Sequence, residues 1–263
     1  MAKYCSLFSG SKGNSTYIGT TSGGILVDVG VSAKRIREAL EARDIDPCSI
    51  QGVCITHEHS DHVAGLRVLT KQYGWTVYAS EGTLSALLEQ QLINPKSDVA
   101  PLYTAAVTIG DMQVVPFHTP HDARESMGFC VYTPDERKIG IATDMGVMRR
   151  EVESLLAQCD LVHIESNHDI GMLRAGPYPL HLQQRILSDR GHLSNVMCAQ
   201  TVVSLAKAGV SRFVLAHLSE QNNTPALAKE TSLSALSREG MVAGRDYLLG
   251  AASPVARCNV TLL

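Results

Sequence analysis

The chain alternates short apolar runs with amphipathic segments, and this pattern predicts a mixed α/β fold. Strand-like runs occur at 24–29, 52–55, 76–79, 113–117, 127–133, 138–142, 161–165 and 212–216. Helical periodicity or helix-start signals occur at 33–42, 83–92, 194–208 and from 224 onwards. Because early strands are joined by hairpin-like turns and later ones alternate with helices, we expect a mixed sheet layered with helices.

Length and composition limit the kinds of protein that this chain can be. It has 263 residues, of which 44% are hydrophobic and 19% charged, so it can bury a sizeable core and lacks the composition of a disordered segment. We expect one domain spanning residues 1–263. No apolar run approaches the ~18 residues of a membrane span. The net charge of -3 gives no global positive field for a polyanionic partner.

The cysteines favour a reducing compartment. There are seven, and none forms the CxxC pair that would indicate a disulfide framework or a thiolate zinc site. We interpret them as small buried hydrophobic residues. With no secretory signal at the start of the sequence, the expected location is the cytoplasm.

Candidate metal-binding side chains gather directly after one predicted strand. His57, His59, Asp61 and His62 follow the apolar run at 52–55. A loop that leaves a buried strand is held firmly at its base and directs its side chains into a cleft. His57 and His59 point to one side in extended backbone, whereas Asp61 and His62 come after a turn. This one loop can therefore serve two metal ions.

The ligand types indicate which metals and what kind of site. Imidazole and carboxylate ligands suit zinc, manganese or iron, and the lack of thiolates favours an open catalytic site over a closed structural one. A histidine-bearing surface loop without function is the alternative, but the position directly after an apolar strand makes it less favoured. We predict two divalent metal ions as cofactors.

On these residues the sequence resembles the metallo-β-lactamase superfamily over nearly its whole length. Residues 57–62 match the HxHxDH signature of the family, and four further motifs match one by one. The resemblance implies an αββα sandwich, in which two mixed β-sheets are flanked by helices. It also implies that Asp28 orients the HxHxDH loop from behind the ligands. The implied metal ligands are His57, His59, Asp61, His62, His121, Asp144 and His217.

Among the remaining histidines, one choice stays open. The third motif contains both His118 and His121, and we favour His121 because it lies further into the loop before the next strand. His118 is the second candidate. His163 alternates within a predicted strand and is expected to be structural, whereas His181 is left undecided.

Within the superfamily, the sequence is most similar to the YycJ/WalJ group of bacterial DNA exonucleases. The resemblance is carried by the polar segments 6–15 (SLFSGSKGNS), 165–178 (ESNHDIGMLRAGPY), 190–195 (RGHLSN) and 217–223 (HLSEQNN). It implies a 5′-to-3′ exonuclease that acts in DNA repair, with DNA as its nucleic-acid partner. The short spacing from Asp144 to His217 leaves little room for the β-CASP insertion of the RNase J branch.

The expected chemistry is hydrolysis of a phosphodiester at a dinuclear metal site. Asp61 is predicted to be catalytic by holding the attacking water, and His192 by protonating the leaving oxygen. The glycine- and serine-rich segment 9–15 is a candidate phosphate cradle. Turn or cap roles are the alternative for each polar residue here. The predicted substrate contacts are Ser11, Lys12, Asn14, Ser15, Asn167, His168, Ser194, Asn195 and Asn222.

Other functions compete with this interpretation. The scaffold also hosts hydrolases of small cyclic phosphodiesters or thioesters, and RNA-processing nucleases. The polar segments favour phosphodiesters. A redox role would call for an appended flavin domain, which the sequence lacks. A non-catalytic binding subunit is less favoured because degenerate members of such families lose ligands, and none is lost here. The sequence does not indicate an oligomeric state.

Overall fold

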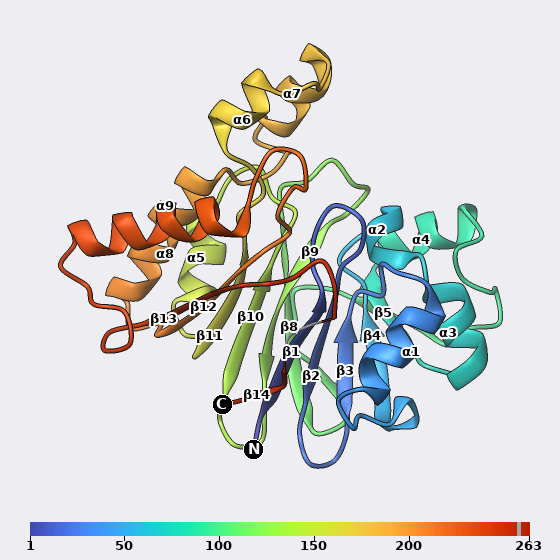
Figure 1. Cartoon of the computed structure of the whole chain (residues 1–263). Coiled ribbons are helices and arrows are strands. Elements are labelled where there is room, and N and C mark those ends of the chain that lie inside the picture. Colours follow the sequence, from blue (N-terminus) through green and yellow to red (C-terminus); the bar gives the residue numbers. More distant parts are fainter. Residues whose placement is uncertain (257–258) are drawn as a thin grey trace.

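The computed structural model describes residues 1–256 and 259–263, and its centre is a pair of seven-stranded sheets (Figure 1). The first sheet contains, in spatial order, β14 (Thr261–Leu262), β1 (Lys3–Phe8), β2 (Ser15–Gly19), β3 (Gly24–Val27), β4 (Ile50–Cys54), β5 (Val77–Ser80) and β6 (Val99–Leu102). The second contains β13 (Leu248–Ala251), β12 (Arg212–Ala216), β11 (Leu161–Glu165), β10 (Lys138–Ala142), β9 (Met127–Tyr132), β8 (Met112–His118) and β7 (Val107–Ile109).

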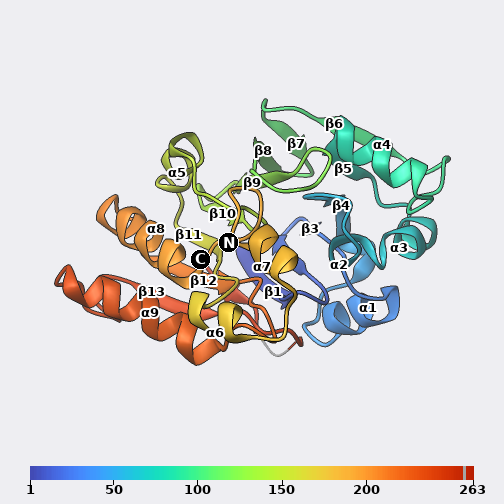
Figure 2. The ribbon, with the colours of Figure 1, turned by 90° about the horizontal axis from the view of Figure 1, so that it is seen from above.

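Helices flank the two sheets. They are α1 (Ala33–Glu41), the 3-10 turn η1 (Pro47–Ser49), α2 (Ser60–Val63), α3 (Leu66–Tyr73), α4 (Glu81–Glu89), α5 (Arg150–Leu156), α6 (Ile170–Ala175), α7 (Leu180–Ile186), α8 (Asn195–Lys207) and α9 (Pro225–Arg238). Helices α1, α3 and α4 pack on the first sheet, and α5, α8 and α9 on the second (Figure 2). Helices α6 and α7 lie beyond the upper edge of the sheets in Figure 1. In the described residues, no helix is both long and apolar enough to cross a membrane.

Three apolar layers hold the sandwich together. One lies between the first sheet and its helices, one between the second sheet and its helices, and the third between the two sheets, where Phe129 and Ile25 are fully buried. Strands covered on both faces are buried along most of their length, which explains why they appear in the sequence as nearly continuous apolar runs. The predicted αββα sandwich of two mixed sheets is confirmed.

Local sequence signals account for the helix starts that were predicted. Ser194 accepts a hydrogen bond from Met197 N at the start of α8, and Thr224 does the same from Leu227 N at the start of α9. The strands predicted at 138–142, 161–165 and 212–216 are confirmed residue for residue as β10, β11 and β12.

Both sheets change from antiparallel to parallel pairing at their middle strand. In the first sheet β2 and β3 pair antiparallel, whereas β3 and β4 are parallel. In the second sheet β10 has the same position between antiparallel β9 and parallel β11. Such switch points leave an opening beyond the carboxyl ends of the strands, which is where ligands bind in α/β sheets. Asp28 and Asp144 follow these two middle strands.

The cysteine prediction holds for most of the described residues. The buried cysteines are Cys5, Cys54, Cys130, Cys159 and Cys198. For Cys48 the prediction was wrong: its side chain is exposed in η1, where Pro47 is the residue that is buried. Cys258 lies outside the described residues.

Candidate metal centre

Loops at the carboxyl ends of five strands meet at one edge of the two sheets, the upper edge in Figure 1. They follow β3, β4, β10, β11 and β12. Parallel neighbours end at the same edge, so residues far apart in the chain come together here. The loop after β8 adds His121 to the same place. All seven predicted metal ligands lie in one cluster at this edge.

Three histidines form the first group of the cluster. His57 and His59 both belong to the loop after β4, with 3.0 Å between His57 Nε2 and His59 Nδ1. His121 Nε2 lies 3.4 Å from His59 Nδ1. A candidate ligand atom of each side chain lies within 4.8 Å of the other two. This spacing suits three ligands of one metal ion.

Asp61, His62 and His217 form the second group, also with candidate ligand atoms within 4.8 Å of one another. Asp144 lies between the groups. Its Oδ2 atom is 3.4 Å from His62 Nε2, and its Oδ1 atom is 3.3 Å from His217 Nε2. The same Oδ1 atom is 3.9 Å from His121 Nε2 in the first group. Asp144 thus has the position of a ligand that two metal ions share.

The cluster has the properties of a metal site and not of an ordinary core. Asp144 is 2% exposed, and its Oδ2 atom has no hydrogen-bond partner among the described residues. A buried carboxylate oxygen without a partner is costly unless a cation or a proton satisfies it. Imidazole and carboxylate donors are the ligands preferred by zinc, manganese and iron. The side chains present therefore fit the divalent metals that the sequence predicts.

Two buried histidines of the cluster have pKa values that are shifted in opposite directions. Burial lowers the pKa of His57 well below its usual value, so this imidazole is neutral and free to donate a lone pair. Burial also acts to lower the pKa of His62, but the carboxylates of Asp144, Asp28 and Asp61 outweigh it and raise that pKa well above its usual value. A ligand must lose its proton to bind a metal, so metal and proton compete at His62.

Asp28 holds the HxHxDH loop from below. Its carboxylate accepts hydrogen bonds from Thr56 N at 2.8 Å and from Thr56 Oγ1 at 2.9 Å. His62 Nδ1 lies 2.8 Å from Asp28 Oδ2 and donates to it, which leaves His62 Nε2 turned toward Asp144. A carboxylate behind a ligand imidazole fixes its tautomer and its orientation. This geometry supports the orienting role predicted for Asp28.

Three residues of the site have backbone conformations that are unusual for side chains other than glycine. Asp28, Asp144 and His217 follow β3, β10 and β12 with φ angles of 60°, 58° and 52°. The left-handed region costs a residue with a Cβ atom roughly 1–2 kcal/mol. Strain of this kind persists where the surrounding structure imposes it, and it concentrates at functional sites. In each case it turns the side chain from the strand direction toward the cluster.

Glu165 is a functional residue that the sequence analysis missed. It is fully buried at the end of β11, and its Oε1 atom lies 2.6 Å from His192 Nδ1. Its Oε2 atom accepts hydrogen bonds from Met145 N and Leu193 N. Although burial opposes it, Glu165 raises the pKa of His192 to about 9. A carboxylate at the end of an apolar strand is the sequence signal that could have found it.

The remaining histidines lie in different parts of the structure. It places His121 in the cluster, whereas His118 is exposed at the end of β8 and outside every candidate metal group in the described residues. His163 is buried between the sheets, with 2.6 Å between its Nδ1 atom and the hydroxyl of Tyr4. That contact suits the structural role predicted for His163. His181 is exposed on α7.

The predicted substrate contacts lie in different surroundings. Ser11 and Asn167 line a cavity beside His192, and Lys12 lies at the surface with its ammonium 2.5 Å from Glu220 Oε2. The others have side chains that are at most 8% exposed: Asn14, Ser15, His168, Ser194, Asn195 and Asn222. Asn14, Ser194 and Asn195 bond within the protein, as Ser194 does at the start of α8. Ser15 Oγ, both ring nitrogens of His168 and Asn222 Oδ1 have no hydrogen-bond partner in the described residues, so substrate contact by this buried group stays a prediction.

Asn14 contacts three of the predicted metal ligands. Its Oδ1 atom accepts a hydrogen bond from Gly10 N and lies 3.2 Å from His217 Nδ1. Its Nδ2 atom lies 3.2 Å from His62 Nε2 and 3.3 Å from Asp61 Oδ2. One amide side chain thus connects three of the predicted ligands, which explains why a polar residue is buried in the segment expected to cradle phosphate.

Comparison with known proteins agrees with this geometry. The sequence profile of the Metallo-beta-lactamase superfamily matches residues 9–217. The chain belongs to this superfamily. Across 256 residues it is 35% identical to Exodeoxyribonuclease WalJ of Streptococcus pneumoniae serotype 2 (strain D39 / NCTC 7466), covering 96% of this chain and 94% of that protein. It is also 35% identical over 243 residues to Exodeoxyribonuclease YycJ of Bacillus anthracis, covering 92% of this chain and 91% of that protein.

A solved structure shows the same fold. The metallo-beta-lactamase fold protein YhfI from Bacillus subtilis superposes with a TM-score of 0.74, covering 100% of both chains at 14% identity. At this identity the likeness concerns the fold alone. It confirms that the two seven-stranded sheets and their helices form a metallo-β-lactamase fold, as the resemblance implied.

Proposed function

We propose that this chain is a metal-dependent exodeoxyribonuclease with two divalent ions as cofactors. The observation that carries the proposal is the convergence of seven imidazole and carboxylate ligands in a chain 35% identical, over 96% of its length, to an exodeoxyribonuclease. The first ion would be held by His57, His59 and His121, and the second by Asp61, His62 and His217, with Asp144 between them. The 5′-to-3′ direction and a role in DNA repair are finer predictions within it.

Different residues around the cluster act at different steps of the proposed hydrolysis. Two divalent ions, when bound, lower the pKa of water toward neutrality and neutralise charge on a phosphodiester. Asp61 is 22% exposed at the rim, where its carboxylate can orient the attacking water. His192 is 19% exposed and donates its Nδ1–H to Glu165, and because its pKa is raised to about 9, its Nε2 carries a proton as well. It is therefore placed to protonate a leaving oxygen.

The cavity beside the cluster favours a polymer over a small molecule. Its volume is about 160 Å³. Pockets that enclose a small ligand measure roughly 300–1,000 Å³. A cavity below that range holds one group of a larger substrate, whose remainder stays outside.

We place the protein in the cytoplasm. The six described cysteines are free, five of them are buried, and none forms a disulfide with another. Free thiols of this kind persist in reducing compartments.

The proposal is tested by digestion of end-labelled DNA, RNA and a small cyclic phosphodiester with metal-reconstituted protein. We expect mononucleotides to be released from DNA, and Asp61→Ala to lower the rate by about 10² or more. Asp98→Ala, which removes an exposed carboxylate outside the cluster, is the matched control and should keep the wild-type rate. Hydrolysis of the cyclic phosphodiester with no release from DNA would replace the nuclease proposal with the small-molecule alternative.

A further inference from the structure

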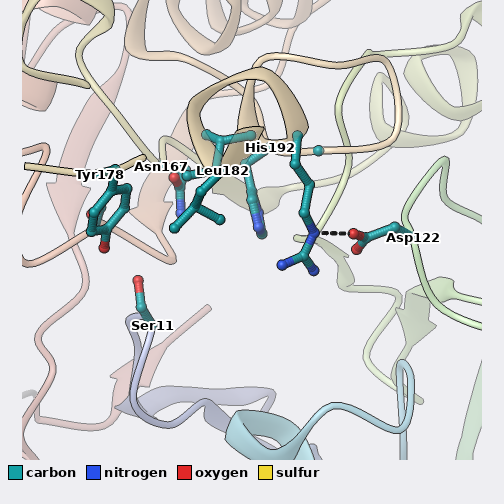
Figure 3. A pocket seen from close by; sticks show the side chains of 10 residues that line it. Ser11, Asp122, Asn167, Tyr178, Leu182 and His192 are labelled. Carbon is teal, nitrogen blue, oxygen red and sulfur yellow. Dashed lines mark hydrogen bonds and ion pairs between the residues drawn. The ribbon is translucent and has the colours of Figure 1, made fainter. Parts of the chain in front are cut away.

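The cavity beside His192 lies under helix α7 and has two chemically different sides. Tyr178 and Asp122 stand on opposite sides of it, with Leu182 and His192 between them, as Figure 3 shows. Arg185 extends from α7 and forms an ion pair with Asp122, drawn as the dashed line. One side is therefore aromatic and aliphatic, and the other is charged. We call this space the α7 pocket.

Hydrogen bonds fix the position of α7, which forms one wall of the α7 pocket, relative to His192. His192 N donates a hydrogen bond to Ile186 O, at the end of α7, at 3.0 Å. Ile186 is 8% exposed, so the helix is anchored against the body of the protein. At the other end, Gln183 Nε2 donates to Tyr178 O at 2.8 Å and fixes the turn that carries the tyrosine. Tyr178 and His192 thus belong to one connected unit.

The proposed reaction determines which part of the substrate lies beside His192. Water adds to phosphorus, the bond from phosphorus to O3′ breaks, and O3′ takes the proton from His192 Nε2 while water releases one to solvent. The nucleoside that bears O3′ must therefore lie next to His192. In digestion from a 5′ end, that nucleoside is the terminal one. The α7 pocket is the cavity that His192 lines.

We propose, on the basis of the exodeoxyribonuclease function above, that the α7 pocket receives the terminal nucleotide of the DNA strand and that Tyr178 holds its base. Tyr178 is half-buried and offers a flat ring, and Leu182 offers an aliphatic surface beside it. Every base has an apolar face that stacks on an aromatic ring, so the contact is tolerant of sequence. That tolerance is what an enzyme needs to remove successive nucleotides.

The charged side of the pocket complements a nucleotide as well. Arg185 bonds to Asp122 through Nε, and the terminal nitrogen atoms of its guanidinium have no hydrogen-bond partner in the described part of the chain. Arginine binds phosphate through such paired donors. A nucleotide with its base against Tyr178 would then have a cation available to its phosphate on the opposite side of the pocket.

The test compares two DNA ends that differ only in the base of the terminal nucleotide. One end carries an ordinary nucleotide and the other an abasic one, and kcat/KM is measured for wild type, Tyr178→Ala, Tyr178→Phe and the control Tyr103→Ala. Tyr103 is 56% exposed and bonds to Glu81, outside the pocket. We expect Tyr178→Ala to lower kcat/KM about tenfold or more on the ordinary end and to leave it unchanged on the abasic end.

The controls separate the possible outcomes. Tyr178→Phe keeps the ring and should restore the wild-type value, and Tyr103→Ala should match wild type on both ends. Equal losses on the two ends for Tyr178→Ala, or no loss on either, would overturn the assignment of the base to Tyr178 while leaving the nuclease function standing. Failure of wild type to hydrolyse either DNA end would overturn the proposed function and this inference together.

Discussion

Replacing Gly30 by alanine should damage the metal centre although no predicted ligand is replaced. Gly30 lies where three backbone segments meet: its N atom donates to Asn14 O at 2.8 Å, and Asn14 N donates to Asp61 O at 2.8 Å. A Cβ atom at Gly30 would lie 1.6 Å from Asp61 O and 2.7 Å from Asn14 N. Both obstacles are backbone atoms, so no side chain can rotate away.

The displacement follows from these distances. Ordinary van der Waals contact begins at 3.4 Å, so Asp61 O must retreat by 1.8 Å, the difference between 3.4 and 1.6 Å. Misplacing a reacting group by about 1 Å costs about 10²-fold in rate. Overpacking of this kind typically costs about 1–3 kcal/mol of stability. Gly30→Ala should therefore lower the rate of DNA hydrolysis at least about 10²-fold and weaken metal binding by the second group of ligands.

The assay measures metal affinity by titration, DNA hydrolysis by release of end label, and stability by urea unfolding, all on one preparation. Gly250→Ala is the matched control, because the nearest atom to its added Cβ, Phe213 O, is 4.0 Å away. It should behave as wild type in all three measurements. If Gly30→Ala binds metal and hydrolyses DNA as wild type does, the backbone contact with Asp61 does not hold the site in place.

Three further predictions address other parts of the structure. Glu165→Gln keeps the shape of the side chain but removes the charge beside His192, so kcat for DNA should fall about 10²-fold or more with KM little changed; a wild-type kcat would remove Glu165 from the mechanism. Alanine at His121 should reduce the metal bound per chain, measured by elemental analysis, while alanine at His118 should not, and the reverse result would exchange their roles. Burial lowers the pKa of His163 to about 3, so below about pH 6.5 the unfolded chain binds a proton that the folded chain excludes until about pH 3. As the pH falls from about 6.5 to about 3, the free energy of unfolding should therefore decrease by up to about 1.4 kcal/mol per pH unit. His163→Gln should make this decrease shallower when it is measured by urea unfolding. An identical slope in the variant would show that His163 titrates normally.

The sequence predicted many of the strands that are buried on both faces, although the buried strands β1 and β2 lie outside the predicted strand ranges. Strands β10, β11 and β12 are mostly apolar because helices and the other sheet cover them, and runs of apolar residues can be recognised in the sequence. The edge strands β6 and β13 escaped prediction because most of their residues are partly or fully exposed and show no alternation. Their pairing with a neighbouring strand decides their conformation.

The candidate site was predictable where its residues are adjacent in sequence. The loop after β4 supplies His57 and Asp61 within five positions, a spacing that indicates ligands directly. The partnership of Glu165 with His192 spans 27 positions and exists only because the loops after β11 and α7 meet. Asn14 was recognised as polar and unusual, but whether it bonds to substrate or to His217 depends on a contact that spans 203 positions.

Digestion of linear and covalently closed circular DNA of the same sequence tests the central claim most directly. Metal-reconstituted protein should release mononucleotides from the linear form and leave the circle intact, because the α7 pocket accepts a strand end. Removal of metal with a chelator should abolish the release, since the ligand cluster would then be empty. Cutting of the closed circle, release from linear DNA that persists without metal, or an intact linear form beside rapid hydrolysis of a small ester would each contradict a metal-dependent exodeoxyribonuclease.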